Sequence, residues 1–296
     1  MRTRINTLAA CFLALVTSAP AVAGVGSRLW ATGGVTSIEG SAGGGLSPWA
    51  LLTGYASDEE WGGTVTLSRA GTDDYSLAVA AAGITWNNRV EVTFARQTLD
   101  LDSLVFTLKD AFSLEQDELV QDIWGLKARL FGDVLYHAWG QWSVGLQYKQ
   151  NREYTVPDAA GSEKASGTDF YLAGSKLFFA AIAGRNLLIN GTVRATRANQ
   201  GGLLGFGGDR NDSYEAMAEG SISLFLSRRW LVGAEYRQKP DNLSFATEDD
   251  WWDLFVAWVP DRRVSVTAAW VNLGEIADVA SLGNQSGAYL SLQASF

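Results

Sequence analysis

Apolar and polar residues alternate with a period of two along much of the chain, and the pattern is clearest near its C-terminus. From position 288 onward, even positions hold small or apolar residues, namely Ala288, Leu290, Leu292, Ala294 and Phe296, and odd positions hold Tyr289, Ser291, Gln293 and Ser295. The segment 286–296 has about the length that crosses a bilayer as a tilted strand with one face toward lipid. The alternation therefore predicts membrane-spanning β-strands.

The same pattern, followed along the whole chain, predicts fourteen strands, with twelve as the alternative count. The fourteen cover residues 28–36, 47–57, 61–70, 75–84, 88–99, 121–132, 140–151, 168–180, 186–198, 213–227, 229–239, 251–260, 262–273 and 286–296. The strands at 140–151 and 262–273 alternate cleanly. The strands at 47–57 and 75–84 are small or apolar on both faces, so only their length and flanking turns predict them.

The connections between these strands are sorted by length. Those after even-numbered strands are mostly short and cover 58–60, 86–88, 133–139, 181–185, 228 and 260–261. Those after odd-numbered strands are mostly long and polar or glycine-rich and cover 37–46, 100–120, 152–167, 199–212, 240–250 and 274–285, with 71–74 as the short exception. Short turns on one side and long loops on the other are typical of bacterial outer-membrane barrels. The predicted fold class is all-β, a transmembrane antiparallel up-and-down β-barrel with short periplasmic turns and long extracellular loops.

A barrel in lipid leaves no strand edge unpaired. We therefore expect the last strand, 286–296, to pair with 262–273 and also with the first strand, 28–36. This closure would place Phe296 at the periplasmic rim near Arg28, with its ring facing outward.

The twelve tryptophans of the chain predict two aromatic belts at the membrane interfaces. Near the predicted short turns lie Trp61, Trp86, Trp139, Trp142, Trp230 and Trp258, and nearer the long loops lie Trp49, Trp251, Trp252 and Trp270.

One segment, 100–112, has a helical period instead. Its apolar residues at i, i+3, i+4 and i+7 are Leu101, Leu104, Val105 and Leu108. With Asp100 or Asp102 as the N-cap, the pattern predicts a short amphipathic helix in the longest loop. This helix could fold into the barrel mouth as a constriction or rest on the rim.

The N-terminus has the three parts of a secretory signal peptide. Arg2 and Arg4 precede the apolar run 8–16, and Ala21-Val22-Ala23 forms an A-x-A cleavage site. The predicted organisation is a signal peptide at 1–23 and a single outer-membrane barrel domain at 24–296. The predicted localisation is the bacterial outer membrane.

Removal of the leader changes the mature chain in two ways. It removes Cys11, the only cysteine, so no disulfide, thiol nucleophile or thiolate metal site remains. It also shifts the formal net charge from −9 to −11, because residues 1–23 contain two arginines and no acid. Such an acidic chain argues against nucleic acid as a partner, since phosphate binding depends on Lys and Arg.

The stretch 33–45 is rich in glycine. It lacks the Lys-Ser/Thr of a phosphate loop and the spacing of a dinucleotide-binding fingerprint. Its glycines permit positive φ and close approach of the backbone to other groups; they include Gly40, Gly43, Gly44 and Gly45. We expect this loop to fold tightly at or into the barrel mouth.

The stretch 31–55, the strand Arg89–Gln97 and the terminal Phe296 together resemble an uncharacterised family of proteobacterial outer-membrane proteins of about this length. The resemblance implies a barrel and an outer-membrane location. It implies no assigned activity and no site residues.

The last strand also resembles the closing strand of bacterial outer-membrane barrels, in which the insertion machinery reads a terminal Phe. The residues that would carry this insertion signal are Tyr289, Leu290, Leu292 and Phe296. Ala294 is smaller than the residue usually found at its position. The expected partners are outer-membrane lipid, lipopolysaccharide, the barrel-assembly machinery and an unknown small solute.

Few residues suggest catalysis or a cofactor. His137, the only histidine, falls in a predicted periplasmic turn, and the motif G-x-S-x-G is absent. The acidic stretches 208–215 and 241–250 do not fit a calcium-loop template. We therefore expect no enzyme, with no catalytic residue, cofactor or metal.

If the apolar strand faces meet lipid, the charged residues face the lumen, because a lipid-facing Lys or Arg costs about 2–4 kcal/mol at the membrane midplane. The residues predicted to line the lumen are Glu91, Lys127, Arg129, Gln147, Lys149, Arg194, Glu215, Glu219, Glu235, Arg237, Asp253 and Arg263. Both signs of charge occur in similar numbers. The lining predicts either a water-filled passage or a network of paired charges.

Three functions are consistent with this lumen. The first is a passive channel or uptake barrel for small solutes. The second is a non-transporting surface or envelope-structural barrel whose long acidic loops bind a partner or the counter-ions of lipopolysaccharide. The third is a transporter of small hydrophobic compounds, which requires an apolar pocket lined by Phe131, Phe225 and Phe255.

Overall fold

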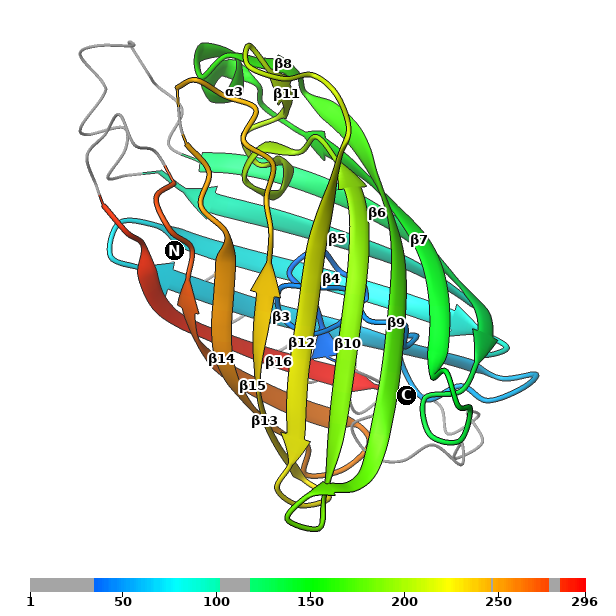
Figure 1. Ribbon diagram of the computed structural model, residues 1–296. Coiled ribbons are helices and arrows are strands. Elements are labelled where there is room, and N and C mark those ends of the chain that lie inside the picture. Colours follow the sequence, from blue (N-terminus) through cyan, green and yellow to red (C-terminus); the bar gives the residue numbers. More distant parts are fainter. Residues whose placement is uncertain (1–34, 102–117, 246, 277–282) are drawn as a thin grey trace, which may run out of the picture.

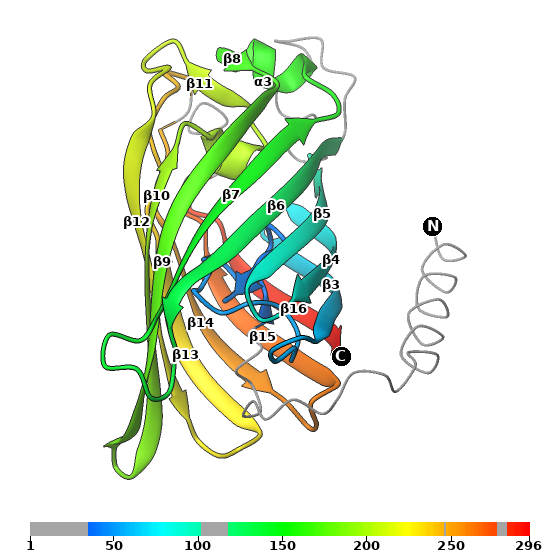
Figure 2. The same ribbon diagram turned by 90° about the vertical axis from the view of Figure 1, so that its right-hand side faces the viewer.

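The computed structural model describes residues 35–101, 118–245, 247–276 and 283–296 and shows a closed antiparallel barrel of twelve strands (Figures 1 and 2). The wall strands are β3 (Trp61–Thr72), β4 (Ser76–Trp86), β5 (Val90–Asp100), β6 (Glu118–Gly132), β7 (Gln141–Asn151), β9 (Ser166–Ile182), β10 (Arg185–Thr196), β12 (Glu215–Phe225), β13 (Trp230–Arg237), β14 (Trp251–Trp258), β15 (Val264–Asn272) and β16 (Ser286–Ser295). The predicted fold class is confirmed with the alternative count of twelve strands. Within the described ranges, no helix has the length and apolar character needed to span a membrane.

The first two predicted strands, 28–36 and 47–57, are wrong where the structure describes them. Residues 35–56, here called the plug, lie inside the ring of strands, where only a short ladder joins β1 (Val35–Thr36) to β2 (Ala42–Gly43) (Figure 2). The backbone of the plug bonds instead to buried polar side chains of the inner wall, for example through the Thr53 N–H, which donates to Glu91 at 2.7 Å. The plug therefore contributes no strand to the wall.

The barrel closes between its last strand and β3. The register runs from Ser295 opposite Thr64 to Gly287 opposite Thr72. The predicted pairing of 286–296 with 28–36 is therefore wrong, because β3 occupies that position; Arg28 lies outside the described residues. Phe296 lies at the short-turn end with its ring exposed, and its backbone exchanges hydrogen bonds with that of Gly63 at 3.0 Å.

Exposed aromatic rings form a belt at each end of the wall. At the short-turn end, Trp61 and Trp86 have ring centroids 6.2 Å apart, and a Trp230–Trp258 pair stacks at 5.9 Å. Nearer the long loops, exposed rings include Phe94, Trp124, Tyr148, Phe170, Tyr214, Trp252 and Trp270. Trp49 and Trp251 do not belong to the belts, because both are buried inside the barrel.

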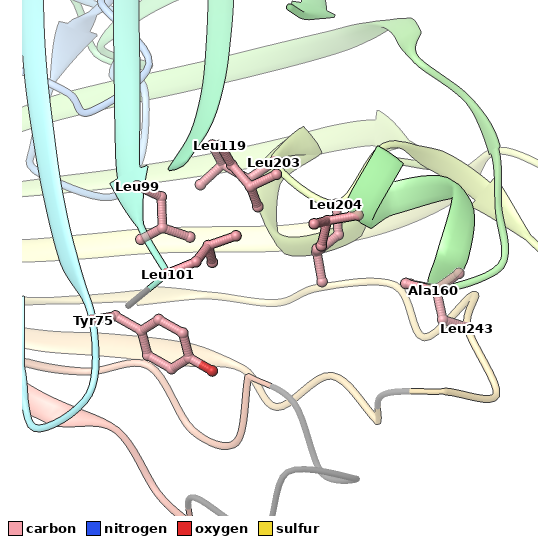
Figure 3. Packing of buried hydrophobic residues seen from close by; sticks show 9 residues of the cluster. Tyr75, Leu99, Leu101, Leu119, Ala160, Leu203, Leu204 and Leu243 are labelled. Atoms are coloured by element: carbon pink, nitrogen blue, oxygen red, sulfur yellow. The ribbon is translucent and has the colours of Figure 1, made fainter. Parts of the chain in front are cut away.

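The long-loop end is covered by packed loops. They contain α3 (Thr155–Ala159), β8 (Ser162–Lys164), η1 (Asn199–Gly202) and β11 (Phe206–Gly208), which pairs with β8. Apolar side chains inside this end form the mouth cluster, whose buried members are Tyr75, Leu99, Leu101, Leu119, Val156, Ala160, Leu203, Leu204 and Leu243 (Figure 3). The predicted helix at 100–112 begins on residues that the structure places otherwise, since Asp100 is the last residue of β5; positions 102–112 lie outside the described residues.

Candidate functional site

The plug folds tightly because its glycines allow the backbone to approach the wall. Gly40 has φ of +91°, in a turn where the Gly40 N–H donates to the Ser37 carbonyl at 2.9 Å. A Cβ on Gly44 would lie 1.4 Å from Oε1 of Glu235, so no other residue fits there without displacing that carboxylate. The glycine-rich composition therefore provides close packing against the inner wall.

Glu39 of the plug binds three cations from three wall strands. Its carboxylate lies 2.5 Å from Lys149 Nζ on β7, 3.0 Å from Arg194 Nη2 on β10 and 2.7 Å from Arg237 Nη2 on β13. All four side chains are buried. One carboxylate thus joins three strands of the wall, each separated from the next by one strand.

Two wall acids balance the charge of these cations. Asp169 lies 2.7 Å from Lys149 and 3.2 Å from Arg194, and Glu219 lies 2.5 Å from Arg194. Together with Glu39 they give three carboxylates and three cations in one buried group, here called the Glu39 ion cluster. Such a group tolerates burial because every charge has a partner.

A second ion pair, between Lys127 and Glu91, binds the backbone of the plug in two places, at Ala42 and at 51–53. Lys127 Nζ donates to the carbonyls of Ala42 at 2.7 Å and Leu51 at 2.9 Å. Glu91, 3.2 Å from Lys127, accepts from the N–H groups of Ala42 at 3.3 Å and Thr53 at 2.7 Å. Donor and acceptor groups of the plug backbone are therefore satisfied by a single wall pair.

A third wall group is unbalanced. Glu235 and Asp253 face each other across β13 and β14, both are buried, and neither has an ion-pair partner in the described part of the chain. Glu235 accepts from the N–H of Leu46 at 2.6 Å, but its Oε1 and the Oδ1 of Asp253 accept no hydrogen bond from any described residue. Two buried acids thus face each other with no cation beside them among the described residues.

Toward the short turns the plug packs against apolar residues. Trp49 and Leu51 join Val134, Leu177 and Leu188 in a buried cluster. Beside it lies a cavity of about 20 Å³ lined by Val35, Trp49, Tyr55, Leu231, Phe255, Ala257, Val259, Arg262, Val264, Ser265 and Ser295. A space of this size holds about one water molecule.

Toward the long loops, the turn that contains η1 contacts the Glu39 ion cluster. Lys149 Nζ donates to the carbonyl of Gly201 at 2.9 Å, and Glu248 accepts from the N–H of Gln200 at 2.8 Å. Lys239 Nζ lies 3.5 Å from Glu248 and donates to the Gln200 side chain at 2.9 Å. Burial raises the pKa of Glu248 to about 7 against the opposing effect of Lys239, and burial lowers the pKa of Lys239 to about 8.

The structure separates the residues predicted to line the lumen into three groups. Those buried inside are Glu91, Lys127, Gln147, Lys149, Arg194, Glu219, Glu235, Arg237 and Asp253. Arg129 and Glu215 are only partly buried, and Arg129 donates to the Gly132 carbonyl beside a register shift. Arg263 is exposed in the turn before β15, so it does not contribute to the interior.

Four charged residues buried inside the barrel were absent from that prediction. Asp169 precedes the outward-facing Phe170 of β9, so the alternation of that strand could have revealed it. Glu39, Lys239 and Glu248 lie outside the wall strands, where no alternation assigns a direction to a side chain. Only the tertiary fold brings these three groups inside.

Phe131, Phe225 and Phe255 do not form one apolar pocket. Phe131 is exposed on the outer face, whereas the other two are partly buried against Leu231 and Val259. His137 lies in an exposed turn, where its Nδ1 accepts from the Trp139 N–H at 3.3 Å. Among the described residues, no group of three or more His, Cys, Asp or Glu side chains is arranged to hold a metal ion.

The predicted insertion-signal residues divide between the two faces of β16. Leu290 and Leu292 are exposed on the outer face, whereas Tyr289 is buried inside and its hydroxyl lies 3.2 Å from Ser68 Oγ. Their role in membrane insertion stays a prediction.

One family model and several solved structures are similar to the chain. The model of a family described as "Protein of unknown function (DUF3034)" matches residues 32–293, and no curated protein matches the chain. Among solved structures, a KdgM porin has a TM-score of 0.48 at 9% identity, covering 79% of this chain and 99% of the porin. The outer membrane protein Omp33 of Acinetobacter baumannii has a TM-score of 0.46 at 12% identity, covering 81% of this chain and 100% of Omp33. The outer membrane phospholipase A of Escherichia coli has a TM-score of 0.38 at 8% identity, covering 81% of this chain and 94% of the phospholipase. At these identities the likeness concerns the fold alone.

Proposed function

The chain belongs to the DUF3034 family of outer-membrane barrels, and we propose that it is a channel for small solutes that the plug closes at rest. The proposal includes export by the leader at 1–23, residence in the outer membrane and no enzymatic activity. The observation that carries it is the attachment of the plug. A segment separate from the wall crosses the lumen and is joined to it by the Glu39 ion cluster.

The wall is complete without the plug. Its twelve strands form a continuous ladder that closes between β16 and β3. Barrels of about eight strands are filled by their own side chains, and a twelve-strand barrel is wider. Displacement of the plug would therefore leave an intact barrel with a passage lined by charged and hydroxyl side chains, among them Lys127, Arg194 and Thr267.

The contacts that hold the plug suit a part that moves. A buried ion pair gains little net free energy, because desolvation of the charges offsets their attraction. The Glu39 ion cluster thus fixes the position of the plug more than it adds stability. When water enters the lumen, Glu39 and its wall partners can replace their contacts with one another by hydrogen bonds to water.

Single-channel recording in planar bilayers tests the proposal. We expect wild-type protein to open rarely, Glu39→Gln to open more often, and a variant lacking residues 35–53 to conduct continuously. Glu59→Gln, an exposed change next to the plug, is the matched control and should behave as wild type. A correctly folded deletion variant that stays silent would rule out a channel.

A reversible tether separates plug movement from other causes of opening. The Oγ1 atoms of Thr36 on the plug and Thr66 on β3 lie 2.8 Å apart. The double variant Thr36→Cys with Thr66→Cys introduces the only thiols of the mature chain, since Cys11 lies in the predicted leader. We expect oxidation to abolish opening of the double variant and reduction to restore it. Opening of the single Thr66→Cys variant should be unchanged by both treatments. Openings that persist in the oxidised protein would show that the plug is not the gate.

A second candidate, transport of small hydrophobic compounds, is favoured by the mouth cluster and by the apolar lining near Trp49, Leu231 and Phe255. Vesicle assays distinguish the two. A polar-solute channel lets small sugars and amino acids swell vesicles that contain the deletion variant, whereas a hydrophobic transporter accelerates uptake of an apolar fluorescent probe by the wild type. If neither the wild type nor the deletion variant transports a polar solute or the apolar probe, the barrel is an envelope-structural protein.

A further inference from the structure

Two arginines and one aspartate form a cluster on the outer surface of the wall. Arg96 of β5 donates to Asp122 of β6 through Nε at 2.6 Å and Nη2 at 2.9 Å. Arg152, directly after β7, donates to the same carboxylate through Nε at 2.6 Å and is also ion-paired with it through Nη2. The Asp122 side chain is 0% exposed, whereas each arginine side chain is 49% exposed.

These side chains point away from the lumen. Successive residues of a strand alternate between its faces, and Phe94 and Trp124, two positions from Arg96 and Asp122, are exposed on the outer face. The inner face holds the intervening residues Ala95 and Ile123, which are both fully buried. The cluster therefore faces the membrane or its surface, and the plug does not contact it.

The neighbouring rings give the height of the cluster in the membrane. Phe94 and Trp124 have centroids 5.3 Å apart, and Trp124 and Tyr148 have centroids 6.1 Å apart. Aromatic rows of this kind mark the boundary between hydrocarbon and headgroups. Arg96 and Asp122 lie two residues closer to the long-loop ends, which is roughly 7 Å along a strand. That position is the headgroup layer of the outer leaflet.

The cluster has an excess of positive charge and unused donors. Two guanidinium groups share one carboxylate, so the net charge is +1. Each guanidinium carries five N–H donors, and within the described residues the Nη1 atoms of both arginines make no hydrogen bond. Asp122 holds the two groups side by side, which prepares them for a further tetrahedral anion.

We propose that Arg96 and Arg152, positioned by Asp122, bind a phosphate group of the lipid A part of lipopolysaccharide. In the outer leaflet of the outer membrane, this phosphorylated glycolipid provides anionic groups at the height of the cluster. A phosphate forms charge-assisted hydrogen bonds with both arginines and neutralises their excess charge. The acyl chains of the same lipid lie below, against Phe94, Trp124 and Tyr148. The site lies on the outer face, so it is independent of the proposed channel.

Binding of purified lipid A to the detergent-solubilised full-length barrel tests this site. We expect the double variant Arg96→Gln with Arg152→Gln to bind diphosphorylated lipid A about tenfold more weakly than wild type, the equivalent of about 1.4 kcal/mol. The matched control is Arg228→Gln with Arg263→Gln, which removes two exposed arginines at the short-turn end and should leave affinity unchanged. Dephosphorylated lipid A should bind wild type as weakly as it binds the double variant.

A third variant separates a built site from general attraction to positive charge. Asp122→Asn raises the net charge of the cluster but removes the carboxylate that positions both arginines. We expect weaker binding of phosphorylated lipid A by this variant, and stronger binding would overturn the proposal. Wild-type affinity in the folded double variant, verified by heat-modifiable migration on gels, would also overturn it, as would equal affinity of wild type for both forms of lipid A.

Discussion

At the scale of single residues, the acid pair Glu235 and Asp253 is buried without an ion-pair partner among the described residues. The two carboxyl groups lie directly opposite each other on neighbouring strands, where two negative charges would repel. Burial strengthens the repulsion because little solvent screens it. Both acids also lie close to the plug, at Gly44 and Gly45.

We predict that Asp253→Asn stabilises the protein by about 1 kcal/mol, because the new amide can donate to Glu235. The control is the same substitution at Asp169, which accepts hydrogen bonds from Arg194 and Thr196 and pairs with Lys149. Asp169→Asn should destabilise the protein by roughly 3 kcal/mol, because it breaks a buried ion network. Urea unfolding in lipid vesicles measures both values, and equal signs for the two variants would contradict this account.

A second residue-scale prediction concerns Gly44. In Gly44→Ala the new Cβ would meet Oε1 of Glu235 at 1.4 Å, so the plug or the carboxylate must shift. We expect faster hydrogen exchange at Ala42 and Leu46, whose N–H groups donate to Glu91 and Glu235. Gly191→Ala is the control, since nothing lies within 4 Å of its added Cβ, and unchanged exchange in Gly44→Ala would refute the close approach.

At the scale of elements, docking of the η1 turn onto Glu248 should depend on pH. Burial raises the pKa of Glu248 to about 7, so this group favours the docked turn at acidic pH and loses that effect as pH rises through 7. Burial lowers the pKa of Lys239 to about 8, so its favourable contribution appears only above that pH and is lost as pH falls through 8. Docking is therefore weakest between pH 7 and 8 and strengthens toward pH 5.

The free energy of docking of the η1 turn should become more favourable by roughly 2 kcal/mol from pH 7.5 to pH 5.0, at about 1.4 kcal/mol per pH unit over part of this range. Hydrogen exchange of residues 198–205, corrected for its intrinsic pH dependence, measures it. In Glu248→Gln, docking of the turn should no longer strengthen as the pH falls from 7 to 5. The same strengthening in that variant would show that another group is responsible.

The elements of the wall could be predicted from the sequence, and the plug could not. A lipid-facing strand must keep one face apolar, so the alternation in residues 140–151 and 262–273 shows which side chains face lipid and which face the lumen. Residues 35–56 mix small, apolar and polar residues without a sustained alternation of apolar and polar positions, and their position is determined by contacts with residues far along the chain. Glu39 meets Arg237 across 198 positions, and no local pattern contains such information. The charges of the wall strands were therefore predictable, but the segment that pairs with them was not.

At the scale of the whole molecule, closure of the barrel depends on β16. This strand pairs with β15 and β3, and the terminal Phe296 continues the ladder through two backbone hydrogen bonds with Gly63. The closed wall therefore requires the backbone of Phe296, whereas its exposed ring contributes little to the folded state. A role for this ring must come from an earlier stage, when the unfolded chain is recognised and inserted.

We predict that Phe296→Ala lowers the amount of protein in the outer membrane of expressing cells at least fivefold, while purified variant and wild type fold into vesicles with equal yield. The ring is lost but the backbone bonds to Gly63 remain, so only recognition by the insertion machinery suffers. Leu254→Ala is the control, because it removes an exposed apolar side chain from β14 and should leave both quantities near wild type. Quantitative immunoblots of membrane fractions and heat-modifiable migration measure the two quantities. A variant that fails equally in cells and in vesicles would show that the terminal ring stabilises the closed barrel itself.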